Sequence, residues 1–120
     1  MSQRLANYLR TYRKHAGLSQ DEVAFLLGGE SGTKVSRYEQ SARQPTLETA
    51  LAYEAMLGIP TRELFAGIFA KVEHSSVDRA ETLARKIRAS GNRETRRKER
   101  TLASLEQVIS RHRSLPARST

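Results

Sequence analysis

The feature that most constrains the fold of this chain is a helical pattern that glycines interrupt at short intervals. Over roughly the first 60 residues, apolar side chains recur three or four positions apart, which is typical of amphipathic helices. Gly17, the pair Gly28-Gly29 and Gly58 each follow such a segment. Glycine commonly ends a helix because it adopts a positive φ without strain. The pattern predicts an all-α fold of short helices.

Small polar residues before each segment predict where the helices of the first half begin. Ser19, followed three residues later by Glu22, has the spacing of a capping box. Helices are expected near Gln3–His15, from Ser19 to the glycine pair, from Ser31 to about Gln40, from Thr46 to Gly58, and from Pro60 through Val72. The residues expected to face the core are Leu5, Leu9, Tyr12, Ala16, Val23, Ala24, Leu27, Val35, Tyr38, Leu47, Ala50, Leu51, Tyr53 and Leu57.

The second half of the chain has a different character. Ser76 is expected to cap a separate helix that carries Val77–Ile87, and Ser90-Gly91-Asn92 to break it. A last helix is expected from Arg93 to about His112, and Leu115–Thr120 is expected to fray. We therefore predict a helical domain over residues 1–67 and a basic helical extension over residues 68–120, which serves either dimerisation or the binding of a partner.

The positive charge is concentrated in that extension. The 120 residues have a formal net charge of +8. Residues 68–120 hold thirteen Lys/Arg against six Asp/Glu, a net charge of +7, whereas residues 1–67 hold eight against seven. Such a balance predicts a polyanionic partner. The basic run at Arg93, Arg96, Arg97, Lys98 and Arg100 is either a solvated helix face or a surface for phosphates, RNA or an acidic protein.

Several classes of protein are disfavoured by composition. The chain has no cysteine, which excludes disulfides and thiolate metal sites. It has neither a run of about 18 apolar residues nor the apolar centre of a signal peptide at its start. A soluble, cytoplasmic protein is expected.

The sequence also lacks the patterns of an enzyme. His15, His74 and His112 lie far apart, and neither HExxH nor GxSxG is present. The segment GGESGTK resembles a phosphate-binding loop only superficially, since Thr33 separates Gly32 from Lys34 and no strand precedes it. No catalytic residue, cofactor or metal site is predicted.

The segment Gln20–Glu39 has the parts of a helix-turn-helix. The small Ala24 permits a close helix crossing, and the glycine pair permits the turn between two helices. Val35 and Tyr38 form the inner face of the expected third helix. Its outer face carries hydrogen-bond donors, namely Ser31, Thr33, Lys34, Ser36 and Arg37. Since a helix fits the DNA major groove, this face is predicted to contact DNA.

Over residues 4–66 the chain resembles the Xre/Cro family of phage-repressor-type (lambda-repressor-like) DNA-binding domains. The matching pieces are Gly17-Leu18-Ser19-Gln20, Ala24, Leu27-Gly28, Val35-Ser36-Arg37-Tyr38-Glu39, Pro45-Thr46-Leu47 and Leu57-Gly58-Ile59-Pro60. The resemblance implies a five-helix domain that binds a two-fold operator on double-stranded DNA as a homodimer.

The resemblance also implies roles for individual residues. It places base contacts on Thr33 and Arg37, with Lys34 and Ser36 nearby. Gln20 and Ser31 match positions that bind phosphates at helix N-termini. Arg13 and Glu39 match an ion pair that joins the first helix to the end of the third. Arg43, in the loop after the third helix, is a further candidate for a phosphate contact.

Two features depart from the family pattern. Members usually have two residues between the second helix and the cap of the third, and this chain has three, Gly28, Gly29 and Glu30. Gly32 also stands where the family often has a side chain that reads a base. Base recognition is therefore expected to depend strongly on Arg37.

These observations lead to two hypotheses about function. The first is a sequence-specific DNA-binding transcriptional regulator, specifically a repressor that binds a palindromic operator. The alternative is an antitoxin-like or other interaction protein whose basic C-terminal helices bind an acidic protein or RNA.

Overall fold

The computed structural model describes residues 5–90 and 93–114, with side chains over residues 5–90 and 98–112. All regular secondary structure in these ranges is helical, which confirms the predicted all-α fold. The chain divides into two compact units, unit 1 (Met1–Ala70) and unit 2 (Lys71–Thr120).

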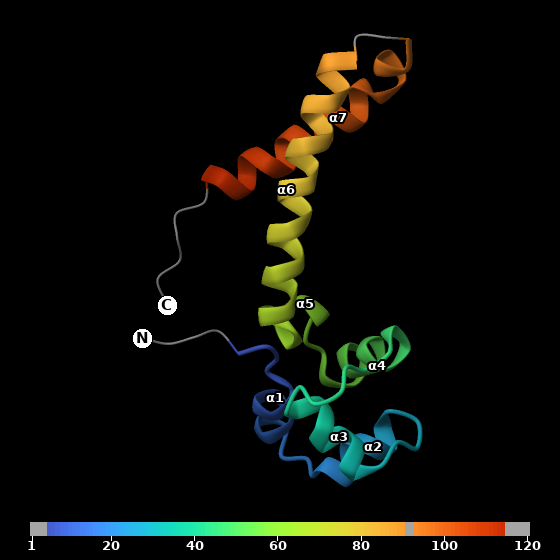
Figure 1. Ribbon diagram of the computed structural model, residues 1–120. Coiled ribbons are helices and arrows are strands. Elements are labelled where there is room, and N and C mark those ends of the chain that lie inside the picture. Colours follow the sequence, from blue (N-terminus) through green and yellow to red (C-terminus); the bar gives the residue numbers. More distant parts are fainter. Residues whose placement is uncertain (1–4, 91–92, 115–120) are drawn as a thin grey trace. The chain divides into compact units, whose positions relative to one another are not determined.

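Unit 1 is built from five short helices and the start of a sixth (Figure 1). The helices are α1 (Leu9–His15), α2 (Gln20–Leu26), α3 (Gly32–Glu39), α4 (Leu47–Leu57), α5 (Thr61–Leu64) and α6 (Ala66–Ser90).

The helix ends of unit 1 are fixed by local hydrogen bonds. The predicted capping box is present: Ser19 Oγ accepts from Glu22 N at 3.0 Å, and Glu22 Oε1 accepts from Ser19 N at 2.8 Å. Thr46 caps α4 in the same way by accepting from Thr49 N at 3.2 Å. Gly58 ends α4 with a φ of +72°. Each cap satisfies an orphan backbone group, which explains why α2 and α4 begin where the sequence predicts.

The core of unit 1 lies between α1, α2, α3, α4 and α5. Leu9, Val35 and Leu64 are completely buried, and Tyr53 is almost so. The rings of Tyr38 and Tyr53 meet edge to face, with centroids 6.4 Å apart. This contact joins α3 to α4 in the favoured geometry for aromatic pairs.

The first helix begins later than predicted. Residues 5–8 are not helical, and α1 begins at Leu9 rather than near Gln3, which lies outside the described residues. Hydrogen bonds to the distant residues Tyr38 and Leu64, and a local one to Leu9, hold the segment instead. Asn7 Nδ2 donates to Tyr38 O at 3.0 Å, Asn7 Oδ1 accepts from Leu9 N at 3.1 Å, and Tyr8 N donates to Leu64 O at 2.7 Å.

Four of the predicted core residues are exposed. Leu5 is 55% exposed, Leu47 73% and Leu51 50%, and Ala16 is exposed as well. α4 is apolar on nearly all sides, so its pattern did not specify which side is buried. The structure buries Thr49 and Tyr53 and leaves Leu47 and Leu51 at the surface.

The predicted break before Ser76 is wrong. α6 runs without interruption from Ala66 to Ser90, and the predicted fifth helix is split at Phe65 into α5 and the start of α6. No proline or glycine lies between Ile68 and Ser90. An exposed serine is tolerated inside a helix, so Ser76 alone does not begin a new one.

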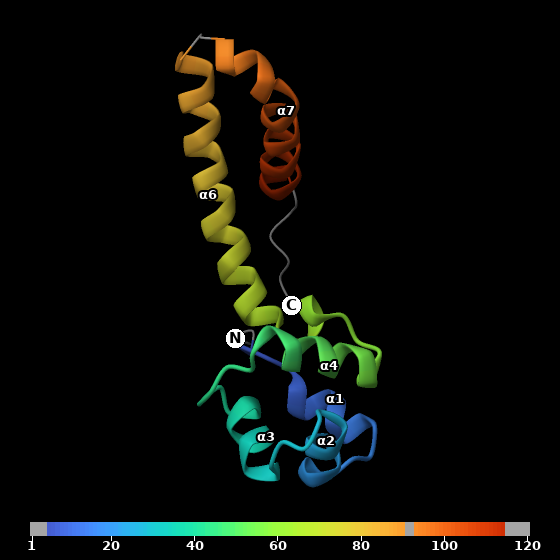
Figure 2. The same cartoon turned by 90° about the vertical axis from the view of Figure 1, so that its right-hand side faces the viewer.

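Unit 2 consists of the rest of α6 and of α7 (Arg93–Ser114), which run antiparallel to each other (Figure 2). Glu73 Oε2 lies 3.1 Å from His112 Nε2, and Arg88 pairs with Glu106. Val77, Ala84 and Ile87 are buried. The predicted break at Gly91-Asn92, the predicted fraying of Leu115–Thr120 and the side chains of Arg93, Arg96 and Arg97 lie outside the described residues.

Candidate nucleic-acid interface

The turn between α2 and α3 is closed by backbone hydrogen bonds. Gly28 N donates to Phe25 O at 3.1 Å, and Ala24 O accepts from Gly29 N at 3.2 Å and from Glu30 N at 3.1 Å. Gly28 and Gly29 have φ values of +95° and +89°, which residues with a Cβ rarely adopt. The glycines thus permit this turn of three residues, and α2 and α3 pack against each other although the turn is one residue longer than is usual in the family.

α3 presents one buried and one accessible side. Val35 and Tyr38 point into the core. Thr33 and Arg37 are exposed, and Lys34 and Ser36 are half-buried. At about 100° per residue, the four candidates for base contacts share one accessible side of the helix.

The four side chains differ in how freely they can contact a ligand. Lys34 Nζ lies 2.9 Å from Glu30 Oε2, and Ser36 Oγ accepts from Gln40 Nε2 at 3.2 Å. Arg37 has neither an ion pair nor a side-chain hydrogen bond within the part of the chain that the structure describes. Its guanidinium can therefore contact DNA without first breaking an internal bond.

The candidates for phosphate contacts lie around the ends of these helices. Ser31 caps α3, because its Oγ accepts from Lys34 N at 3.1 Å. Gln20 is the first residue of α2, and its Nε2 donates to Glu39 Oε1 at 3.1 Å. Arg43 is exposed in the loop that follows α3.

Arg13 and Glu39 form a shielded ion pair beneath this surface. Arg13 Nε lies 2.5 Å from Glu39 Oε2, and Nη2 lies 3.2 Å from Oε1. Arg13 Nη1 also donates to Leu18 O at 2.9 Å. The two side chains are only 10% and 4% exposed, and the hydrogen bond to Glu39 raises the pKa of Arg13. With Gln20, the pair ties together α1, the start of α2 and the end of α3.

Residues 9–64 match the model of the helix-turn-helix family. They form an Xre/Cro-like helix-turn-helix domain. Members of this family are DNA-binding transcription regulators.

No curated protein and no solved structure matches the chain significantly. Within the described residues, no helix combines the length and apolar character needed to span a membrane.

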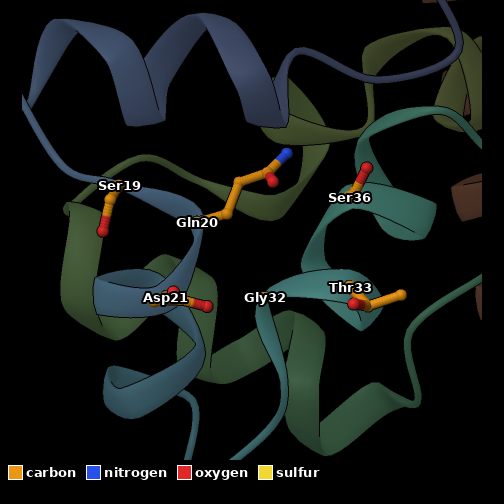
Figure 3. A pocket seen from close by; sticks show the side chains of 6 residues that line it. All are labelled: Ser19, Gln20, Asp21, Gly32, Thr33 and Ser36. Atoms are coloured by element: carbon orange, nitrogen blue, oxygen red, sulfur yellow. The ribbon is translucent and has the colours of Figure 1, made fainter.

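A polar hollow opens on the helix-turn-helix domain between the first turns of α2 and α3 (Figure 3). It is lined by Ser19, Gln20, Asp21, Gly32, Thr33 and Ser36. Asp21 extends toward Gly32 across this hollow. Sequence reasoning did not identify Asp21, because an acidic residue in the first turn of a helix is common for reasons of helix stability alone. Only the packing of α2 against α3 brings it to the surface that carries Thr33.

Proposed function

We propose that the protein is a homodimeric transcriptional repressor that inserts α3 into the major groove of a palindromic operator. The observation that carries the proposal is the division of α3 into a buried side with Val35 and Tyr38 and an accessible side with Thr33 and Arg37, whose guanidinium has no ion pair or side-chain hydrogen bond among the described residues. A groove-reading helix needs this combination, because its inner side must fix the helix while its outer side reaches base edges.

The roles of the surface residues follow from their chemistry. Arg37 is suited to bind guanine O6 and N7 with two hydrogen bonds. Thr33, Lys34 and Ser36 contact neighbouring base edges. Lys34 exchanges its contact with Glu30 for one with DNA, which makes its contribution smaller than that of Arg37.

Phosphate contacts position the domain on the duplex. Ser31 and Gln20 stand at the N-termini of α3 and α2, where the backbone N–H groups of a helix favour an anion. Arg43 adds a positive charge beyond the C-terminal end of α3. Because residues 1–67 have a net charge of only +1, affinity depends on this local placement.

The dimer places its two α3 helices on successive major grooves, about 34–36 Å apart. A palindromic operator matches the two-fold symmetry of such a dimer. The bound protein represses by covering a promoter, and the cytoplasm is its expected location.

The test is selection of binding sites from random duplex DNA with the full-length protein. We expect an enriched palindrome, with two chains per site by sedimentation. Arg37→Ala should weaken binding to this site at least about tenfold. Arg62→Ala, which removes an exposed arginine of α5, is the matched control and should bind as the unchanged protein does. Failure of the full-length protein to enrich any sequence at low salt would overturn the proposal.

A second candidate role concerns unit 2. Its helices expose Leu83 (46%) and Val108 (39%), and residues 68–120 carry a net charge of +7. These features favour an acidic protein or RNA as a further partner. If Arg37→Ala abolishes operator binding but leaves binding to RNA or to an acidic protein unchanged, this role is separate from the reading of DNA.

A further inference from the structure

The first residue of α3, Gly32, leaves space that a side chain of α2 occupies. A Cβ built on Gly32 would lie 2.1 Å from Asp21 Oδ1 and 3.1 Å from Asp21 Cγ. Any other residue at this position would therefore displace the Asp21 carboxylate. The position where related domains often carry a base-reading side chain is filled from the neighbouring helix.

The Asp21 carboxylate is available for a ligand. It lies in the hollow that Thr33 and Ser36 also line, next to the accessible side of α3 (Figure 3). Within residues 5–90 and 98–112, it has neither an ion pair nor a side-chain hydrogen bond. Asp21 is an exposed residue.

A carboxylate accepts hydrogen bonds but donates none. In the major groove the hydrogen-bond donors are the amino groups of cytosine and adenine, whereas guanine and thymine present acceptors. Adenine presents its N7 acceptor next to its amino group, so a carboxylate favours cytosine. A phosphate is an unsuitable ligand, because two negative charges would approach each other.

We propose that Asp21 is a specificity-determining residue whose carboxylate selects cytosine at one position of each half-site. Gly32 is its positioning partner, since the absence of a side chain there lets Asp21 lie against the start of α3. The inference rests on the proposed function, because it requires that α3 enter the major groove.

The test compares selected DNA sites for the full-length protein and three variants. Asp21→Asn should shift the preference at one position from cytosine to adenine, because an amide both donates and accepts and so matches adenine N6 and N7. Gly32→Ala should displace Asp21 and weaken that preference about tenfold while the other positions are unchanged. Glu48→Gln is the matched control, since it removes an exposed acidic charge of α4 outside the hollow and should leave the motif unchanged.

The outcomes separate this inference from the proposed function. If the full-length protein enriches no motif, both are wrong. If it enriches a motif that Asp21→Asn leaves unaltered, only the inference fails. It also fails if Asp21→Asn tightens binding to all sequences by one factor, because Asp21 then only repels phosphates. If Asp21→Asn changes only the melting temperature, Asp21 serves the first turn of α3 and not DNA recognition.

Discussion

At the scale of single residues, the Arg13 side chain connects α1 with the segment before α2 and with the end of α3. It contacts Glu39 at the end of α3 and the carbonyl of Leu18 before α2. Both charged side chains are largely shielded from water. Such a pair, once formed, leaves a buried uncompensated charge when one partner is removed.

Arg13→Ala should lower the free energy of unfolding by about 3–5 kcal/mol, because Glu39 loses its positively charged partner while its side chain stays shielded from water. Lys34→Ala is the control. This substitution breaks the ion pair between Lys34 and Glu30, in which the lysine side chain is one-third exposed. It should lower the free energy of unfolding by no more than about 1 kcal/mol. Urea unfolding of the two variants measures the difference. An unchanged midpoint for Arg13→Ala would contradict the structural role of the pair.

Tyr53 is buried, and its hydroxyl has no hydrogen-bond partner among the described residues. Burial raises its pKa above the ordinary value of 10.0, because the ionised phenolate would lose its hydration. The folded state therefore holds the proton more tightly than the unfolded state. The stability from this group is complete below pH 10 and is lost as the pH rises above it.

Tyr53→Phe should leave the domain at least as stable at neutral pH, with a gain of up to about 1 kcal/mol, because it removes an unsatisfied buried hydroxyl. The variant should also lose less stability than the unchanged protein as the pH rises above 10. Unfolding measured against pH for both proteins gives the two slopes. A clear loss of stability in Tyr53→Phe at neutral pH would mean that the hydroxyl is in fact bonded.

At the scale of elements, two glycines are needed for different reasons. Gly28 has a φ of +95°, and nothing lies within 4 Å of a Cβ added there. Gly67, near the start of α6, has no positive φ, but an added Cβ would lie 2.2 Å from Leu5 O and 2.7 Å from Ala6 Cα. The first requirement is backbone conformation, and the second is the close approach of another backbone segment.

Gly28→Ala should cost about 1–2 kcal/mol through backbone strain alone. Gly67→Ala should cost more, because residues 5–6 must move and the hydrogen bond from Ile68 N to Ala6 O must lengthen from 3.2 Å. Denaturant unfolding ranks the two variants. If Gly67→Ala were as stable as the unchanged protein, this result would contradict the close packing of residues 5–6 against Gly67.

At the scale of the whole molecule, each unit has its own buried side chains. The buried core residues of unit 1 all fall within residues 9–64 of the sequence, and Phe65 packs against them. The net charge of residues 1–70 is +1, because residues 68–70 carry no charge. Unit 1 thus holds the candidate interface, whereas the excess positive charge belongs to the rest of the chain.

A chain that ends at Ala70 should therefore fold and select the same half-site as the full-length protein. Its affinity should depend less steeply on salt, since nonspecific contacts of the basic helices with phosphates are lost. Circular dichroism checks the fold, and binding at several salt concentrations gives the slope. Loss of the motif would mean that unit 2 is needed for reading, and an unchanged slope would mean that unit 2 does not touch DNA.

The sequence by itself determined the features that depend on neighbours along the chain. Caps such as Ser19 and Thr46 bond to backbone groups three residues away, and the glycine pair sets its own turn. The spacing of Val35 and Tyr38 fixed which side of α3 is buried, and with it the accessible positions of Thr33 and Arg37.

Only the tertiary structure decided the features that depend on distant partners. Asn7 bonds to the backbone of Tyr38, which keeps residues 5–8 out of the first helix. The buried side of α4 is chosen by what packs against it, because the helix is apolar nearly all round. Asp21 meets Gly32 only because α2 and α3 are packed against each other. Local hydrogen bonds and periodicity are encoded within a few residues, whereas these contacts join segments whose approach no short stretch of sequence specifies.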